Sequence, residues 1–264
     1  MNKIGIIGLG YVGLPLAVEF GKVLPQLRLR VEEDMQIKDL SERKVLATVI
    51  SLMERTYIRV GNAEYEKANG SFGLTTLKDK HVKINGSTIT FAFKGKRGVS
   101  HNIVLQNKRL AKVVKDCRDI PGKELFQYYT ESGERKSIDS SMLNSYIKEI
   151  TGADFSAKDF RTWAGTLHML RSLHALEKAE TAAQRKSNIV TALNEVSLKL
   201  GNTRTVCKKY YVHPGIIDLY EKDEINKYLK ELDDLEEPDE KTGFTKDEDV
   251  LMKILKQLIA SNPK

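Results

Sequence analysis

Four short stretches of this sequence carry residue types that suit chemistry on a phosphodiester. They read Y-I-R-V-G-N at 57–62, F-K-G-K-R-G-V-S-H at 93–101, K-D-F-R-T-W-A-G-T at 158–166 and L-G-N-T-R-T-V-C-K-K-Y-Y at 200–211. Together they supply two arginines, a lysine in a glycine turn, an amide and a late tyrosine. A tyrosine can attack phosphorus and form a covalent intermediate. Arginine offers paired donors to the oxygens of a phosphorane that carries extra negative charge.

The late tyrosine has a neighbour, because Tyr210 and Tyr211 are adjacent. On one continuous helix, the nine steps from Asn202 to Tyr211 would turn through about 900°. The side chains of Asn202 and Tyr211 would then lie on opposite faces of the helix and could not act together. We therefore expect the helix to break before or at the tyrosine. The dipeptide His213-Pro214 supports this break, since the residue before proline avoids helical geometry and proline suits the first turn of a new helix.

In their order and flanking residues, these stretches resemble the type IB DNA topoisomerases of bacteria and poxviruses, from about residue 23 to residue 220. The resemblance implies that Tyr211 is the nucleophile and forms a 3′-phosphotyrosine, although an error of one residue would select Tyr210. It also implies that Arg59 and Arg161 stabilise the transition state. Lys96 would then be the general acid that protonates the leaving 5′ oxygen.

The resemblance assigns further roles. Asn202 stands where poxvirus and eukaryotic members carry histidine and bacterial members carry asparagine, so we expect it to donate to an oxygen and not to act as a base. Tyr65 matches a tyrosine that contacts a DNA phosphate, with a place in the core as the alternative. Lys94 and Arg97, which flank the general acid, are expected to contact the DNA backbone.

The implied fold is α+β: a mainly helical catalytic domain of the topoisomerase IB/tyrosine recombinase type with a small antiparallel sheet. The residue pattern agrees with it. Asn85-Gly86 predicts a type I′ hairpin turn, and residues 94–98 predict the next hairpin. Helices are expected over residues 25–53 with a break at 38–41, then over 64–69, from Asn107 with breaks at 121–122 and 131–135, and over 140–150, 156–175 and 177–199. Strands are expected at 73–77, 81–84, 87–93 and 99–105.

The first 22 residues resemble instead the start of a nucleotide-sugar dehydrogenase, with Gly8, Gly10 and Gly13 in a G-x-G-x-x-G motif. That motif binds a dinucleotide only within a β-α-β unit whose second strand ends in an acidic residue. No β-branched run precedes Glu32 and Glu33, and the Leu/Arg pattern there is helical. We therefore predict no cofactor.

The expected division is an incomplete segment at 1–22 and a catalytic domain at 23–264, with an acidic helical tail from about 221 to 264. The β domain with which family members clamp the opposite face of the duplex is expected to be missing, because the resemblance begins at the helix that normally follows it.

The charge distribution is consistent with double-stranded DNA as the partner. The chain of 264 residues has a net charge of +7, yet residues 221–249 hold 13 acidic residues against 5 lysines, so the remainder carries about +15. Such a surface suits a phosphate backbone. The two cysteines are too few and too scattered for a disulfide framework or a zinc site, which favours the cytoplasm. We expect a monomer associated with the nucleoid, with no membrane, nucleotide cofactor or metal.

Two alternatives remain at this point. A tyrosine recombinase shares the fold and the nucleophile, but Lys158-Asp159-Phe160-Arg161 replaces the H-x-x-R box of recombinases, and no separate core-binding domain is present. The other alternative is a DNA-binding remnant without turnover.

Overall fold

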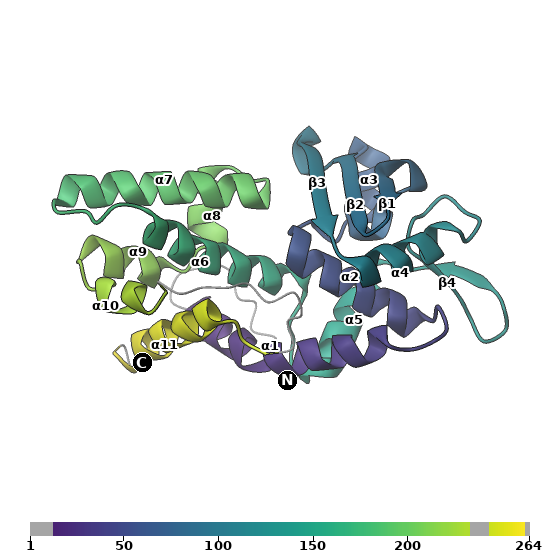
Figure 1. Cartoon of the computed structure of the whole chain (residues 1–264), viewed down its shortest axis with the longest axis horizontal. Coiled ribbons are helices and arrows are strands. Elements are labelled where there is room, and N and C mark those ends of the chain that lie inside the picture. The colour runs from purple at the N-terminus through teal and green to yellow at the C-terminus, as the bar shows by residue number, and fades with distance from the viewer. Residues whose placement is uncertain (1–12, 233–242, 262–264) are drawn as a thin grey trace. The chain divides into compact units, whose positions relative to one another are not determined.

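The computed structural model of this protein describes residues 13–232 and 243–261 (Figure 1). The described chain is mainly helical, with a three-stranded antiparallel sheet and a two-stranded hairpin, so the predicted small antiparallel sheet among helices is confirmed. The chain divides into two compact units. We call Gln26–Ala157 the sheet unit and Met1–Pro25 with Lys158–Lys264 the helical unit, and each is described by itself.

Helix α1 (Gly13–Met35) contains Pro25, so it begins twelve residues before the predicted start. Its buried side chains follow the helical period, with Phe20 and Leu24 in the helical unit and Leu27 and Val31 in the sheet unit. This continuous apolar stripe explains why the helix persists through a proline that removes a backbone donor. Gly8 and Gly10 of the glycine motif lie outside the described residues, and the predicted boundary at residue 22 stays a prediction.

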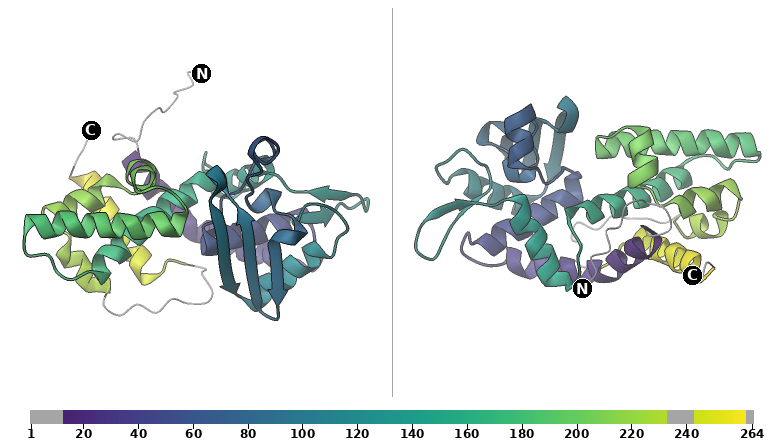
Figure 2. Two further views of the ribbon diagram at one scale, coloured as in Figure 1. Left: turned by 90° about the horizontal axis from the view of Figure 1, so that it is seen from above. Right: turned by 180° about the vertical axis from the view of Figure 1, so that it is seen from behind.

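The sheet consists of β1 (Val82–Asn85), β2 (Thr88–Lys94) and β3 (Ser100–Gln106) in that order, with both pairs antiparallel (Figure 2). Its buried face carries Ile89, Phe91 and Phe93 toward the helices. Short 3-10 turns η1 (Leu74–Thr76), η2 (Asp79–His81) and η3 (Lys96–Gly98) link some of these elements. The other elements of the sheet unit are α2 (Glu42–Thr56), α3 (Ala63–Asn69), α4 (Lys108–Arg118), β4 (Gln127–Tyr129), β5 (Arg135–Ser137) and α5 (Ser140–Thr151).

The turn between β1 and β2 corrects one prediction. Asn85 pairs with Thr88, so the two loop residues are Gly86 and Ser87. Of these two only Gly86 has positive φ, at 58°, whereas a type I′ turn needs positive φ at both central positions. Glycine at the first central position is instead the arrangement of type II′ turns. The hairpin prediction is confirmed, and its turn lies one residue later than predicted.

Two further strand predictions were wrong. Residues 73–77 form no strand, because η1 folds back and the amides of Leu74 and Thr75 donate to the carbonyls of Arg59 and Val60. The hairpin of β4 and β5, which pairs Tyr129 with Arg135, falls where only helices and breaks were expected. Its signal was present in the run Tyr128-Tyr129-Thr130, since aromatic and β-branched residues before a glycine turn favour strands.

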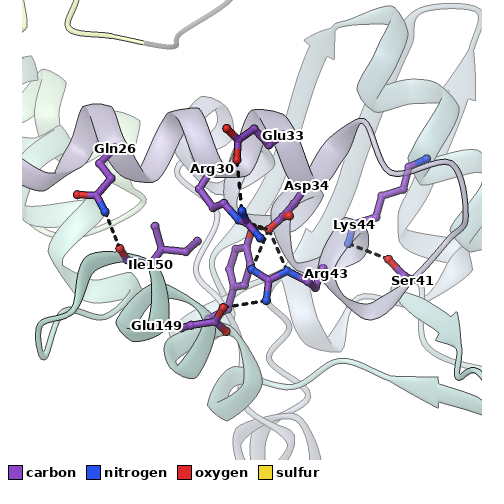
Figure 3. Close-up of polar contacts among 10 residues, drawn as sticks. Gln26, Arg30, Glu33, Asp34, Ser41, Arg43, Lys44, Glu149 and Ile150 are labelled. Atoms are coloured by element: carbon purple, nitrogen blue, oxygen red, sulfur yellow. Dashed lines mark hydrogen bonds and ion pairs between the residues drawn. The ribbon is translucent and has the colours of Figure 1, made fainter.

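A network around Asp34 joins three helices of the sheet unit (Figure 3). Asp34 is 4% exposed, and its Oδ2 accepts from the Tyr146 hydroxyl at 2.7 Å. Arg30 Nε and Arg43 Nη2 approach the same oxygen at 3.3 and 3.2 Å. Burial and the Asp34 carboxylate raise the pKa of Tyr146 above its ordinary value. The three donors satisfy the buried charge and fix α1, α2 and α5 together.

The helical unit contains the longest helices after α1. Phe20 of α1 packs edge-on against Phe160 at 5.0 Å between ring centroids. Trp163 is buried and donates to Glu248 at 3.1 Å. Helix α7 starts five residues later than predicted, because Thr181 and Gln184 form a capping box. The elements are α6 (Ala157–Ala175), α7 (Ala182–Leu200), α8 (Arg204–Tyr210), α9 (Pro214–Glu221), α10 (Asn226–Leu229), η4 (Lys230–Leu232) and α11 (Lys246–Ala260).

We expect Asp34→Asn to lower the free energy of unfolding by about 1–3 kcal/mol, because two arginines then lose a buried anion and the Tyr146 hydroxyl loses a charged acceptor for a neutral one. Urea denaturation followed by circular dichroism measures this change. The matched control is Asp154→Asn, which removes an exposed carboxylate paired with Lys148 and should leave stability nearly unchanged. Equal effects of the two variants would contradict the role given to the Asp34 network.

Candidate active site

The candidate general acid lies at the tip of the β2–β3 hairpin. Lys94 and Ser100 are the last strand pair, and the Gly95 amide donates to the Val99 carbonyl at 2.7 Å. Lys96, Arg97 and Gly98 then project as an exposed tip, in which Arg97 has a φ of 63°. Positive φ is uncommon for a residue with a side chain. The tip is therefore a tight, defined turn that carries two cations into solvent.

A groove of about 590 Å³ brings together four of the predicted residues, Arg59, Tyr65, Lys96 and Arg97. The Lys96 ammonium lies over the Tyr65 ring, 5.6 Å from its centroid. Tyr65 is 55% exposed, so the alternative that it belongs to the core was wrong. Lys94 is exposed on β2 but does not line this groove.

The Arg59 segment is held by its backbone. Helix α2 ends at Thr56, and the left-handed conformation of the next residue, Tyr57 (φ 56°), turns the chain out of the helix. The Arg59 carbonyl then accepts from the Leu74 amide at 2.8 Å. A Cβ on Gly73 would come within 2.5 Å of that carbonyl, so only glycine allows this approach. The half-buried Arg59 side chain thus projects from a fixed segment into the groove.

In the helical unit, Arg161 of α6 is buried, with 6% exposure. Its Nη2 donates to the carbonyl of Leu200, the last residue of α7, at 2.7 Å. That carbonyl has no partner within its own helix, and the C-terminal end of a helix favours a cation. Burial lowers the pKa of Arg161 below its ordinary value, and the nearby Tyr211 offsets only part of this effect. The Asn202 side-chain amide reaches the same carbonyl at 3.5 Å.

Tyr211 lies beside this buried cation. The Arg161 guanidinium stands over the Tyr211 ring, 5.1 Å from the centroid. The predicted break is confirmed: α7 ends at Leu200, Gly201 is left-handed, α8 ends at Tyr210, and Pro214 opens α9. Asn202 and Tyr211 therefore lie at opposite ends of α8 and not on one continuous helix. Arg161, Asn202 and Tyr211 are brought together within one unit.

Tyr210 has different surroundings. It is 39% exposed and lies under the Lys209 ammonium at 5.2 Å. It lines a separate hollow with Arg204 and Lys208, whereas Tyr211 does not line that hollow. Of the two adjacent tyrosines, only Tyr211 thus faces the Arg161 guanidinium, which favours the register of the prediction.

Two residues of α6, Gly165 and Thr166, contact the Tyr211 backbone, and we call this pair the Tyr211 seat. A Cβ on Gly165 would lie 2.5 Å from the Tyr211 carbonyl oxygen, so the two segments touch at backbone distance. Thr166 Oγ1 lies 3.3 Å from the same oxygen and accepts from the His213 amide at 3.1 Å. The sequence analysis gave Gly165 and Thr166 no role. Gly165 is one helical turn after Arg161, on the same face, and that spacing was the available signal.

His213 closes the segment after the tyrosine. Its Nδ1 accepts from the Gly215 amide at 3.1 Å and caps α9, so the ring is neutral with its proton on Nε2. The side chain is 4% exposed, and burial lowers its pKa to about 4. Sequence reasoning used His213 only as the residue before proline.

Within residues 13–232 and 243–261, no group of three or more His, Cys, Asp or Glu side chains has the arrangement of a metal site. No helix of the described chain is long and apolar enough to cross a membrane.

We expect Gly165→Ala to destabilise the protein by about 1 kcal/mol or more. Alanine normally stabilises a helix relative to glycine by about 1 kcal/mol, but here its methyl group would overlap the Tyr211 carbonyl. Thermal and urea denaturation decide the sign, and a stabilised variant would show that the seat is not close-packed.

The His213 pKa predicts a dependence of stability on pH. Because the folded pKa lies below the ordinary value of 6.5, stability is complete above pH 6.5 and declines as pH falls toward 4, by about 3 kcal/mol. His213→Asn keeps a capping acceptor and removes this titration. The free-energy difference between wild type and variant, measured by urea denaturation, should therefore shift steadily between pH 6.5 and 4. A constant difference would mean that His213 does not titrate as described.

Comparison with known proteins bears on these residues. The family model for the catalytic core of eukaryotic DNA topoisomerase I matches residues 15–238. DNA topoisomerase 1B of Acanthamoeba polyphaga mimivirus is 31% identical over 227 residues, which cover 83% of this chain and 68% of the relative. DNA topoisomerase 1B of Vaccinia virus (strain Copenhagen) is 25% identical over 199 residues, covering 75% and 60%.

DNA topoisomerase 1 of Daucus carota is 28% identical over 209 residues, covering 76% of this chain and 25% of the relative. The matched part of this chain thus spans between 60% and 68% of the two viral relatives and a quarter of the plant one. The family model covers most of the chain, from the first described helix through the segment that holds Tyr211. The chain therefore belongs to the type IB DNA topoisomerases and contains residues of their catalytic core.

Proposed function

We propose that this chain relaxes supercoiled DNA by cutting one strand, letting the duplex swivel, and resealing it through a 3′-phosphotyrosine at Tyr211. The observation that carries the proposal is the Arg161 guanidinium over the Tyr211 ring, in a chain matched by the topoisomerase I core model. A buried guanidinium beside a phenol is suited to stabilise the negative charge that develops as the phenol oxygen attacks phosphorus.

In the proposed step, the Tyr211 Oη–P bond forms and the bond from phosphorus to the 5′ oxygen breaks. The phenol proton passes to water, and Lys96 gives a proton to the leaving 5′ oxygen. The reverse attack by the 5′ hydroxyl reseals the strand and releases Tyr211. The phosphotyrosine keeps the energy of the broken bond, so resealing requires no ATP.

Charge on the phosphorane is shared among the remaining residues. Arg161 and Arg59 donate to its nonbridging oxygens, as guanidinium geometry allows. Asn202 adds an amide donor, and since an amide cannot take up a proton, it is not the base. Arg161 and Asn202 both donate to the Leu200 carbonyl. This shared acceptor supports the proposal that their side chains act at the same place.

Residues in and beside the groove of the sheet unit are proposed to contact the DNA backbone. Tyr65 is exposed beside Lys96, where its hydroxyl can contact a phosphate. Arg97 shares the hairpin tip, and Lys94 precedes it on β2. An exposed lysine on a hairpin tip can enter a groove of the duplex, and the mobility of its long side chain suits an acid that must follow the leaving oxygen.

We further infer that the chain acts as a monomer on double-stranded DNA, in the cytoplasm with the nucleoid, without a nucleotide or a metal. We also propose that residues 23–264 form the catalytic domain and that this domain has the fold shared by type IB topoisomerases and tyrosine recombinases. The acidic tail, which includes α10 and α11, has no role in the proposed step.

The sharpest prediction concerns the two tyrosines. Tyr211→Phe should abolish covalent attachment to a labelled duplex while keeping DNA binding, because it removes one hydroxyl and no packing volume. Tyr210→Phe is the matched control and should attach normally. Denaturing gels separate the covalent adduct, and the released end should carry a 5′ hydroxyl. The opposite result would place the nucleophile at Tyr210, and no adduct with wild type would favour a remnant without turnover.

The same assay tests the role of the buried Arg161. Arg161→Ala should slow attachment by about 10²–10³, the scale for one lost donor to a charged transition state. Circular dichroism checks that the variant is folded, because Arg161 also binds the Leu200 carbonyl. A folded variant that attaches at the wild-type rate would exclude the role proposed for Arg161.

A further inference from the structure

Helix α3 carries Tyr65 into the groove of the sheet unit but places no side chain in the core. Of its seven residues, only Glu66 is not exposed. A helix this short is not stable alone in water, and helices in proteins normally gain their stability from an apolar face packed on a neighbour. Because α3 buries no such face, polar contacts have to hold it in place.

The two ends of α3 keep only its local shape. The Asn62 side chain accepts from the Glu64 amide at 2.7 Å, and the amide of the left-handed Gly70 donates to the Glu66 carbonyl at 2.9 Å. These bonds lie within residues 62–70, so they do not determine how the helix is placed on the rest of the unit. Its placement requires a side chain of α3 that binds another segment.

Glu66 provides that contact. The Lys78 ammonium lies 2.9 Å from Glu66 Oε1 and 3.1 Å from Glu124 Oε1. Burial lowers the pKa of Lys78, but the two carboxylates more than offset this effect and the pKa lies above its ordinary value. We call the ion pair of Lys78 with Glu66 the α3 anchor. Within the described chain, the other polar or ring contact from α3 to a different segment is Tyr65 under Lys96, which is itself at an exposed tip.

The backbone of Lys78 is fixed by the core beside it. Leu77 is fully buried, and its carbonyl accepts from the Leu125 amide at 2.8 Å. The Lys78 amide donates to Nδ1 of His81 at 3.0 Å. The His81 ring packs against Phe72, with 4.3 Å between the ring centroids. The α3 anchor therefore joins an exposed helix to a segment whose own position is set by buried residues.

The residues of the α3 anchor are distinct from the residues that line the groove. Tyr65 lines it, whereas Lys78 and Glu66 do not. Adjacent residues of a helix project about 100° apart, so holding Glu66 toward Lys78 fixes the direction in which Tyr65 points. The Lys78 ammonium is shared between two carboxylates, so a direct contact with a DNA phosphate would require it to leave them.

We propose that Lys78 is a positioning residue for phosphate recognition: through Glu66 it holds α3 so that the Tyr65 hydroxyl meets the DNA backbone. The inference rests on the proposed function, in which Tyr65 contacts a phosphate. Lys78 acts through the helix and does not itself touch the DNA. Glu124 binds the same ammonium from outside α3, so its removal leaves the α3 anchor in place.

The experiment is a double-mutant cycle between Lys78→Met and Tyr65→Phe in the full chain. Each protein also carries Tyr211→Phe, so that fluorescence anisotropy measures non-covalent binding to a short labelled duplex across a salt series. Glu66→Ala removes the partner on α3. Its matched control is Glu124→Ala, which removes the same charge and the other partner of the same ammonium. Lys78→Arg keeps a cation at the anchor.

Tyr65→Phe, Lys78→Met and Glu66→Ala should each weaken binding about tenfold, the scale of one lost hydrogen bond to a charged group. In the Tyr65→Phe background, Lys78→Met should weaken binding no further, because the contact that it positions is already gone. Lys78→Arg and Glu124→Ala should bind as tightly as the parent chain. The slope of log K against log salt should not change with Lys78→Met, since the lost contact is made by an uncharged hydroxyl.

Four results would overturn the proposal. A Lys78→Met effect of equal size in the Tyr65→Phe background shows that Lys78 does not act through Tyr65. Equal effects of Glu66→Ala and Glu124→Ala show that the tie to α3 is not what matters. A salt slope shallower by about 0.9 shows that Lys78 binds a phosphate itself. Full affinity of Tyr65→Phe shows that there is no contact to position.

Two further measurements keep these outcomes separate. Circular dichroism checks folding, and if Lys78→Met does not fold, the cycle of Glu66→Ala with Tyr65→Phe decides, because Glu66 lies on an exposed helix. Covalent attachment by the chain with Tyr211 intact is assayed apart from binding. Its failure would count against the proposed function and leave the result for the α3 anchor unaffected.

Discussion

The buried guanidinium of Arg161 is the constraint on which the helical unit depends. A charge removed from water is costly unless it is hydrogen-bonded, and here the terminal carbonyl of α7 and the ring of Tyr211 compensate it. This arrangement requires α7 to end at Leu200, since a continued helix would use that carbonyl internally. The left-handed Gly201 ends it there. The need to compensate the buried Arg161 charge therefore accounts for the positions of three features: the end of α7, the Asn202 amide and the Tyr211 ring.

The position of Tyr211 also depends on backbone contact. Gly165 lets the tyrosine segment touch α6, and Thr166 accepts from the His213 amide. Because His213 caps the next helix through a neutral ring, the segment is held on both sides of the tyrosine. A tyrosine on a short link between two helices thus has little freedom. This is consistent with the proposed role of Tyr211, because the proposed reaction needs the same geometry in cleavage and in resealing.

The sheet unit holds its cations differently. Its interior is fixed by the Asp34 network and by the apolar face of the sheet, whereas Lys96 extends from an exposed hairpin tip. An exposed lysine on a hairpin tip is consistent with the proposed acid for the leaving oxygen, just as a buried arginine is consistent with a charge held in one place.

The sequence by itself determined most of the helices and the order of the main strands, which follow from local period and from turn residues. The candidate site residues followed from the resemblance to type IB topoisomerases. It could not place the hairpin turn after Asn85 to the residue, nor show that residues 73–77 fold onto the Arg59 segment, because both depend on contacts made elsewhere in the chain.

Tertiary structure alone decided which of two adjacent tyrosines faces Arg161, and which glycine gives the tyrosine its seat. It also decided that Tyr65 is exposed. The physical reason is that adjacent residues share every local propensity. Only the end of α7 and the packing of α6 distinguish the environment of Tyr211 from that of Tyr210.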